Sequence, residues 1–563
     1  MGFKMYVAIG YKDIFDDYES IDIKELIKDI PTKNSLQILG YFMAQLHSKE
    51  RKKDLQIEFL KMWLGRLPNE VNNQVEGYIK KAITKNSKFS FLDNVSLLIL
   101  VEKILLNENN LEILDNLTPE QELQLFKAYL ICCQEWIDKQ WPNFNIPKIK
   151  DESDLIKVLL PSQIPYQEIQ ELKDFRLQFI KAIYFFKFCE KNVEFQEYLK
   201  IFLKEYKLSS WQDYLKNLLA LYIRKFEELK TPSVINVPKE FPEVINFLED
   251  LSIDKNNYEI KIDFLNLREK PVYQIDETNF VFLNLNFLVD KIYQGIQFDF
   301  AKVLLKNSAT YKGKPIKKTG NFMGIFGNEF SENGLLYSVM NFAFEKSDYI
   351  KFEGNFIKQY IKAEPDYYMR DKGKIYLFEF KNVYLGADIK HSYDLEKIKA
   401  ELFKKFVENQ SGKPKGITQL INSIDLIRNG GFEKLDSFNY QEAIIYPIIV
   451  YVDFSFNLAG INYMLNKEFK RLLEEKGSQH LKNIKNLTMI DLDSFIKFQD
   501  LFRDKRLKLN NCLNEYFDTL TNPKDIFDRI GTFNVFLHHK TSKIDYGSPL
   551  MLMEEVGKIF PKE

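Results

Sequence analysis

The sequence predicts an α+β protein in two parts: an all-α N-terminal region over residues 1–245 and an α/β domain with a mixed central sheet over residues 246–563. Apolar residues recur at helical spacing almost throughout from Tyr18 to Glu228. Three prolines within residues 230–244 then interrupt helix formation and mark a linker. Beyond them, apolar strands alternate with amphipathic helices.

Length and composition describe a well-packed globular protein of more than one domain. The chain has 563 residues, of which 45% are hydrophobic and 15% aromatic, more than a disordered chain carries. Its 79 basic and 80 acidic residues give a formal charge of −1, so a local basic patch would have to hold any nucleic acid. The four cysteines lack C-x-x-C spacing, which argues against a zinc ribbon and favours a reducing compartment.

No membrane or secretory segment is predicted. No apolar run approaches the roughly 20 residues that a membrane helix needs, and Met1 to Asp13 lack the pattern of a signal peptide. We therefore expect a cytoplasmic protein without membrane contact.

The N-terminal region is predicted to be an array of helices without a catalytic motif. Val95 to Leu106 is so apolar that we expect a helix buried on most of its circumference. Thr118 followed by Pro119 predicts the start of another helix. Because no catalytic motif is found in this region, we expect a regulatory or partner-binding role, or self-association.

The second part is expected to open with short antiparallel strands. Tyr258 to Leu267 alternates as a strand does. Pro271–Ile275 and Phe280–Leu285 flank a polar turn at 276–279, which predicts a hairpin.

A basic stretch follows, and glycines at positions 313 and 320 predict that it is a flexible loop. Such a loop could contact phosphate groups, or it could be solvated without a ligand, and the sequence leaves both open. Its lysines are Lys302, Lys306, Lys312, Lys314, Lys317 and Lys318.

Residues 364–382 predict a β-hairpin that ends in charged side chains. Two β-prone runs flank a polar turn that contains Gly373. Side chains alternate along a strand, so Glu379 and Lys381 share one face of the second run. Asp366 begins the first run, and strand pairing would bring it close to Glu379.

Asp366, Glu379 and Lys381 together suit phosphodiester hydrolysis. Two carboxylates offer hard oxygen ligands for Mg²⁺ or Mn²⁺, and a lysine can orient a water or offset charge on a phosphate. The alternative is a solvated hairpin whose acid and lysine form a surface ion pair. Acid-x-Lys triplets recur elsewhere in the chain, whereas only one of the 18 prolines, Pro365, precedes an aspartate.

The Pro-Asp pair at 365–366 and, after a spacer of twelve residues, the triplet Glu379–Phe380–Lys381 resemble the PD-(D/E)xK nuclease superfamily. The resemblance implies a restriction-endonuclease-like core. In such a core Asp366 and Glu379 would bind the divalent metal, with the Phe380 carbonyl completing its ligands. Lys381 would position the attacking water or neutralise developing charge.

The resemblance also implies a glutamate on the helix before the first core strand, after a glycine that opens this helix. Gly327 precedes Glu329 and Glu332, which lie three residues apart on one helical face. Glu332 is the first choice for an accessory metal ligand or water contact, and Glu329 the second. The alternative is that both acids favour the dipole at a helix start.

The core is expected over residues 327–453, followed by a C-terminal helical extension. Strands are predicted at Tyr349–Phe352, in the hairpin and at Ala443–Val452, although Pro447 fits a central strand poorly. Helices are predicted at Tyr393–Val407 and Gly416–Ile427. This order of helices and strands is that of the fold which the chain resembles.

Both helices between the strands carry candidate nucleic-acid contacts. Exonuclease-like relatives carry Gln-x-x-x-Tyr on the helix after the lysine, but here Ser423 occupies the tyrosine position, which leaves processing of DNA ends in doubt. The candidate contacts are Lys397, Lys404, Lys405 and Gln419.

The sequence therefore predicts a divalent-metal-dependent nuclease. By analogy with most relatives the substrate is DNA, and a role in antiviral defence or restriction is expected. An RNA endonuclease is one alternative. Another is a non-catalytic nucleic-acid-binding or scaffold protein that keeps the nuclease fold.

Overall fold

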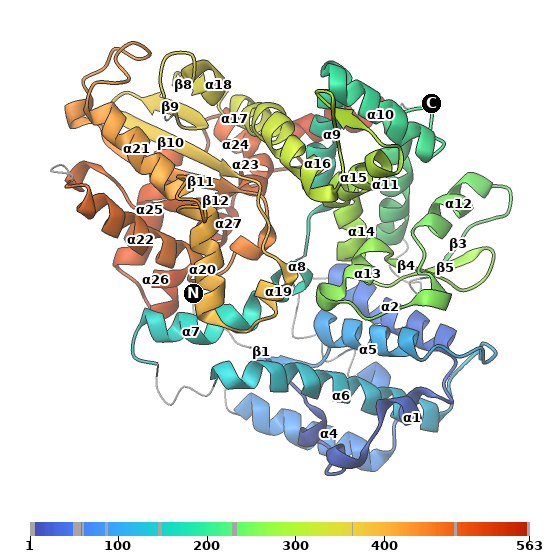
Figure 1. The fold of residues 1–563 in the computed structure, drawn as a ribbon. Coiled ribbons are helices and arrows are strands. Elements are labelled where there is room, and N and C mark those ends of the chain that lie inside the picture. The colour runs from blue at the N-terminus through green and yellow to red at the C-terminus, as the bar shows by residue number, and fades with distance from the viewer. Residues whose placement is uncertain are drawn as a thin grey trace.

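A five-stranded mixed sheet organises the C-terminal half of the computed structural model (Figure 1). The structure describes residues 6–48, 58, 61–84, 88–144, 149–170, 172–227, 234–362, 364–477 and 481–559. The order across the sheet is β12-β11-β10-β9-β8. β8, β9 and β10 pair antiparallel, whereas β10, β11 and β12 pair parallel. The bounds are β8 (Ile350–Glu353), β9 (Tyr367–Asp371), β10 (Lys374–Lys381), β11 (Ile444–Tyr451) and β12 (Thr488–Asp491). The predicted α+β class with a mixed central sheet is confirmed.

Strand β10 separates two apolar layers because its side chains alternate as predicted. Ile375 and Leu377 pack in one cluster with α20 (Leu395–Phe406), α21 (Gly416–Arg428) and α22 (Ile461–Glu475). Tyr376 and Phe378 pack in another cluster, which forms the opposite layer. That layer contains α17 (Tyr337–Ala343), α23 (Leu492–Lys497), α24 (Gln499–Arg503), α25 (Leu509–Thr521) and α27 (Phe533–Thr541). Helices therefore cover both faces of the sheet (Figure 1).

β11 lies inside the sheet although it contains Pro447. On one side Pro447 lies opposite Leu377 of β10. The pairing of β11 with β12 begins at Ile448, so the ladder on that side starts just after the proline. Pro447 has no N–H to donate, and because it lies before the ladder with β12 begins, no hydrogen bond between β11 and β12 is lost.

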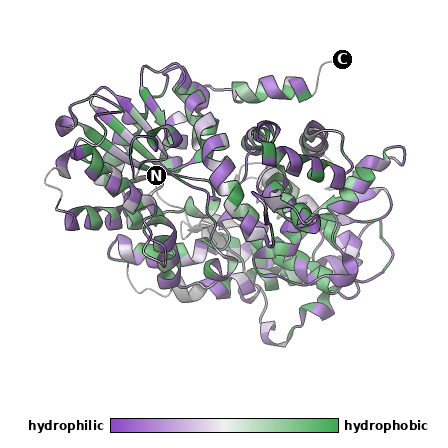
Figure 2. Cartoon of the chain, turned by 45° about the horizontal axis from the view of Figure 1, so that its top comes forward, coloured by the Kyte–Doolittle hydropathy of each residue, from purple (hydrophilic) through white to green (hydrophobic). Residues whose placement is uncertain are grey.

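The N-terminal region is mainly helical. Its helices are α1 (Ile23–Ile27), α2 (Thr32–Ser48), α4 (Asn69–Thr84), α5 (Asn94–Leu106), α6 (Pro119–Phe144), α7 (Glu152–Gln163), α8 (Gln167–Gln170), α9 (Phe175–Lys191), α10 (Val193–Glu205) and α11 (Trp211–Glu227). The predicted buried helix is α5, and Asp93 caps it by accepting hydrogen bonds from the N–H groups of Val95 and Ser96. Hydrophilic and hydrophobic residues alternate along many helices, as expected where one face is buried (Figure 2).

The N-terminal region is not purely helical, and the strand predicted at 258–267 is wrong. β1 (Tyr6–Ala8) and β2 (Lys88–Ser90) form a short parallel pair. Asp263 and Phe264 have φ of 62° and 55°, which an extended strand cannot accommodate. Residues 258–267 therefore include a turn of 3₁₀-helix and the start of α13 (Leu265–Glu269).

The predicted hairpin at 271–285 is confirmed. β4 (Val272–Gln274) and β5 (Asn279–Phe282) pair antiparallel, and β3 (Val234–Asn236) adds a third strand beside β5. The expected linker thus contains β3 and, from Pro242, the start of α12 (Pro242–Asp250).

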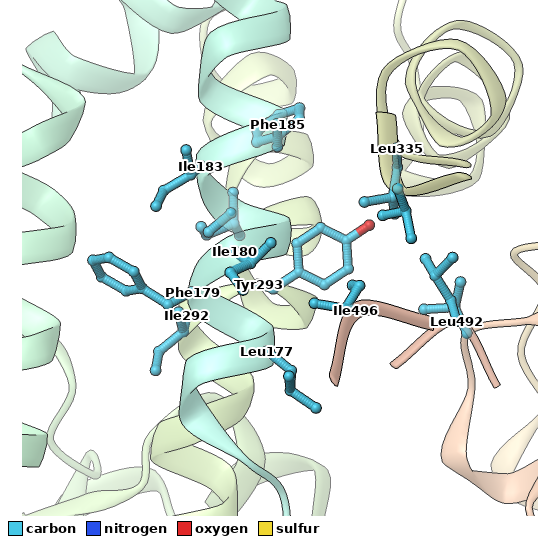
Figure 3. Packing of buried hydrophobic residues seen from close by; sticks show 14 of the residues in the cluster. Leu177, Phe179, Ile180, Ile183, Phe185, Ile292, Tyr293, Leu335, Leu492 and Ile496 are labelled. Atoms are coloured by element: carbon cyan, nitrogen blue, oxygen red, sulfur yellow. The ribbon is translucent and has the colours of Figure 1, made fainter. Parts of the chain in front are cut away.

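Three apolar clusters connect the N-terminal region with the rest of the chain. Figure 3 shows Tyr293 between Ile180 of α9 and the side chains of Leu335 and Ile496. A second cluster joins α5 and α6 to β4 and β5. A third cluster joins α7 to α20 and α21. Each cluster contains residues from both sides of residue 245, so packing marks no boundary there.

The remaining α-helices complete the described fold. They are α14 (Leu285–Ile292), α15 (Gln294–Lys306), α16 (Thr319–Phe326), α18 (Gly354–Ile357), α19 (Ala387–Lys390), α26 (Ile526–Ile530) and α28 (Leu550–Ile559). Among the described residues no helix has both the length and the apolar character that crossing a membrane requires.

Candidate functional site

The predicted hairpin brings Asp366 and Glu379 together. The β9–β10 pairing ends at Tyr367 and Phe378, and the next residue on each strand is one of the two acids. The Phe380 N–H donates to Asp366 Oδ2 at 2.6 Å. This bond continues the hairpin beyond its last backbone pair and fixes the Asp366 carboxyl group beside β10.

Lys381 links Glu379 to helix α21. Its Nζ lies 3.0 Å from Glu379 Oε2 and 3.2 Å from Gln419 Oε1. Helix α21 begins at Gly416, where a Cβ atom would lie 2.9 Å from the Phe406 carbonyl oxygen and 3.3 Å from Lys381 Cε. A side chain at this position would therefore crowd the lysine. Gln419, the expected nucleic-acid contact, accepts a hydrogen bond from Lys381 and so helps to orient this lysine.

Glu332 reaches the same cluster from a continuous helix made of α16, a π-helical stretch η5 (Gly327–Leu336) and α17. Gly327 lies inside this helix with φ of −59°, so the expectation that it opens the helix is wrong. Helix formation begins eight residues earlier because residues 319–326 carry no breaker other than glycine. Short π-helical stretches occur often at functional sites.

The two candidate glutamates on η5 have different partners. Glu329 accepts hydrogen bonds from the Tyr311 hydroxyl and, at 3.1 Å, from Lys312 Nζ. Glu332 instead interacts electrostatically with Asp366 and Lys381. Of the two, Glu332 is the residue in the cluster.

The cluster contains three carboxyl groups and one ammonium group. Burial and the charge of Asp366 raise the pKa of Glu332 to about 7. Burial also raises the pKa of Asp366 and that of Glu379. Burial alone would lower the pKa of Lys381, but the charges of Glu379 and Asp366 outweigh it and raise this pKa. One buried ammonium group thus faces three carboxyl groups.

The crowding of these carboxyl groups and one unpartnered atom suit a divalent cation, because its charge would favour their ionised forms. Glu379 is fully buried, and its Oε1 has no hydrogen-bond partner among the described residues. Within the same residues no group of three His, Cys, Asp or Glu side chains could hold a metal ion by itself. Mg²⁺ is commonly held by one or two carboxylates together with waters and substrate phosphates, so the pair Asp366 and Glu379 fits this ion.

The lysines expected to contact nucleic acid lie outside the cluster. The predicted flexible loop is instead a tight hairpin of β6 (Thr310–Tyr311) and β7 (Lys314–Pro315), because Lys312 and Gly313 adopt positive φ at its turn. Lys312 pairs with Glu329, while Lys314, Lys317 and Lys318 are exposed. Lys302 and Lys306 belong to α15 and pair with Glu269 and Glu205.

The lysines of α20 pair with acids on or next to their own helix. Lys397 lies 3.9 Å from Asp394, and Lys404 and Lys405 each lie 3.1 Å from Glu401. These pairs are partly exposed and are worth little energetically, so the lysines stay available to a phosphate.

Two further features of the site have no clear signal in the sequence. Asn382, directly after Lys381, donates to the Ser331 hydroxyl at 2.8 Å and so connects β10 to the π-helical stretch. Lys415, at the start of α21, has a pKa lowered by burial and by the charge of Lys381. Both depend on contacts between segments far apart in the chain.

Comparison with protein-family models, with curated proteins and with solved structures finds no match to this chain.

Proposed function

We propose that this protein is a divalent-metal-dependent nuclease that hydrolyses phosphodiester bonds in DNA. The observation that carries the proposal is the cluster of Asp366, Glu379 and Lys381 at the end of β10, in which a fully buried Glu379 oxygen has no partner among the described residues. The choice of DNA, and a role in antiviral defence or restriction, rest on the resemblance to PD-(D/E)xK nucleases.

In this proposal Asp366 and Glu379 hold Mg²⁺ or Mn²⁺, together with the Phe380 carbonyl. When bound, such an ion polarises a phosphodiester and makes water a stronger nucleophile. The hydrogen bond from the Phe380 N–H keeps the Asp366 carboxyl group in place for this task.

Lys381 and Glu332 supply charge and proton chemistry. Glu379 and Gln419 hold the Lys381 ammonium group, which would offset negative charge on the phosphate or orient the attacking water. Glu332, whose pKa is about 7, can take up or release a proton near neutral pH.

The first experiment measures cleavage of linear and circular duplex DNA, and of RNA, with Mg²⁺, with Mn²⁺ and with EDTA. The parent is compared with Asp366→Asn and Lys381→Met, and with Glu329→Gln as a control that removes an acid near the site but outside the cluster. We expect metal-dependent cleavage by the parent and the control. The other two variants should lose activity by about 10³-fold or more.

A second readout separates metal binding from turnover. Mg²⁺ at about 100 times its Kd should stabilise the parent by about 2.7 kcal/mol, seen as a rise in melting temperature, and should not stabilise Asp366→Asn. Absence of both cleavage and metal stabilisation, with nucleic acid bound equally in EDTA, would support the non-catalytic binding protein instead.

A further inference from the structure

A basic pocket lies at the other end of β10 from the Asp366–Glu379–Lys381 cluster. It has a volume of about 400 Å³ and opens between the β9–β10 turn, the loop after α17 and the start of α25. Lys372, Lys374, Lys505 and Lys508 line it, together with the acids Asp348 and Asp371. Four ammonium groups against two carboxylates make this pocket attractive to an anion, although the whole chain carries a formal charge of −1.

Two of the lysines hold unusual backbone conformations. Lys372 and Lys505 have φ of 53° and 61°, in the left-handed region where glycine or asparagine is usual. Lysine at such a position carries a conformational cost that glycine would avoid.

Ion pairs within the protein fix two walls of the pocket. Three successive ion pairs join the loop after α17 to the end of α24 and the loop that follows it, and they hold two walls of the pocket together. They are Glu345–Arg503 at 2.7 Å, Lys346–Asp504 at 2.7 Å and Asp348–Lys505 at 3.2 Å. Each pair is exposed and weak alone, but a network across the same two loops restricts their separation.

The rest of the lining suits a nucleoside. Tyr349 contributes a partly buried aromatic ring that packs against Phe344 and Tyr376, and Ser347 and Asn510 offer hydrogen-bonding groups. Lys508 is the N-cap residue of α25 and makes no side-chain capping bond, so the first N–H groups of this helix add to the positive potential. The volume lies within the range of small-molecule sites, about 300–1,000 Å³.

We propose that this pocket binds a nucleoside phosphate, with the phosphate groups on the four lysines and the base beside Tyr349. The proposal is independent of the nuclease chemistry proposed for Asp366, Glu379 and Lys381. A free nucleotide and the phosphorylated end of a nucleic-acid strand share this chemistry, and the test separates them.

The test uses the full chain and a variant chosen to fold. Lys372→Gly removes a charge at a position whose backbone favours glycine, and Lys508→Ser removes a charge while supplying a helix cap. The matched control is Lys467→Ser with Lys470→Ser, which removes two exposed lysines from α22 outside the pocket. Calorimetric titration with EDTA present measures binding of ATP, tripolyphosphate and adenosine.

We expect ATP to bind the parent more tightly than tripolyphosphate, and the pocket variant to bind ATP at least about tenfold more weakly. The control should bind as the parent does. Short single-stranded DNA with a 5′-phosphate or a 5′-hydroxyl then competes against a fluorescent ATP analogue. Competition by the phosphorylated strand assigns the strand end as a ligand, and its absence assigns the free nucleotide.

Three results would overturn the proposal. They are no binding of ATP to the parent, an equal loss of affinity in the pocket and control variants, and tripolyphosphate binding as tightly as ATP. The last result would remove the nucleoside and leave a site for inorganic anions.

Discussion

Glu102 is a carboxyl group buried in α5 with little to stabilise its charge. Burial raises its pKa to about 8, although a hydrogen bond from the Tyr258 hydroxyl and the charges of Lys139 and Lys103 favour ionisation. The ordinary value is 4.5, so the folded state binds a proton that the unfolded state has lost between these two values. The free energy of unfolding should therefore fall as pH rises from 4.5 through about 8.

Glu102→Gln should remove this part of the pH dependence, because glutamine resembles the protonated acid. At pH 9 we expect the variant to be more stable than the parent by at least about 1 kcal/mol, with a smaller difference at pH 5. Urea unfolding at pH 5, 7 and 9 measures this, with the exposed Glu112→Gln as the control. A constant difference at all three pH values would contradict the prediction.

Tyr293 buries a hydroxyl group that has no hydrogen-bond partner among the described residues. Figure 3 shows this oxygen directed toward the side chain of Leu335. Because an unpaired buried hydroxyl costs free energy, Tyr293→Phe should raise the free energy of unfolding by about 1 kcal/mol.

The contrasting substitution is Tyr129→Phe. The buried Tyr129 hydroxyl donates to the Phe91 carbonyl at 2.8 Å and accepts from the Asp93 N–H at 3.3 Å. Its removal leaves a buried carbonyl and N–H without this partner and should lower stability by about 1–3 kcal/mol. Denaturant unfolding of both variants measures the two effects, and the same sign for both would refute this account of Tyr293.

At the scale of elements, the π-helical stretch η5 decides which glutamate reaches the cluster. Glu332→Gln should reduce the proposed cleavage by about 10- to 100-fold, the usual effect of losing a group that supports a metal site. Glu329→Gln should change it by no more than about twofold, because Glu329 pairs with the exposed Lys312. Initial rates on DNA, with folding checked by circular dichroism, measure this pair, and equal rates in both variants would show that η5 does not distinguish them.

Regular elements were predictable from the sequence where one local pattern dominates. The alternation along β10 and the apolar run of α5 require only neighbouring residues, and both are confirmed. β12 was missed because Thr488–Asp491 is short and begins and ends with polar residues. The false strand at 258–267 has the right alternation, but the left-handed turn at Asp263 and Phe264 is not visible in hydropathy.

The candidate site was predictable only in its hairpin. The spacing between Pro365-Asp366 and Glu379-x-Lys381 can be recognised in the sequence. Pairing of strands β9 and β10 brings these residues together. Residues three apart share a face of an α-helix, so the sequence left Glu329 and Glu332 as alternatives. The wider turn of a π-helix separates their directions, and it depends on packing between distant segments.

At the scale of the whole molecule, the N-terminal helices belong to the same cores as the sheet. Helix α9 contributes Phe179, Ile180 and Phe185 to the cluster that also buries Phe378 of β10. A buried ion pair joins the same helix to α23, with Lys181 Nζ 2.7 Å from Asp493 Oδ1. Lys390 of α19 lies 3.2 Å from Glu168 of α8 in a second buried pair.

A fragment of residues 246–563 should therefore not fold alone, although it contains the whole five-stranded sheet. Removing α9 exposes the apolar side chains that pack against its core residues. Each large side chain exposed in this way costs about 1.5–3 kcal/mol of free energy. The loss from a few such side chains equals the free energy of unfolding of a typical domain. We expect the fragment to aggregate or to lack a cooperative melting transition, whereas the full chain melts in one transition. Co-expression with residues 1–245 should restore solubility, because the missing surface is supplied in trans. A soluble 246–563 fragment with a cooperative transition near that of the full chain would show instead that the C-terminal half is an autonomous domain.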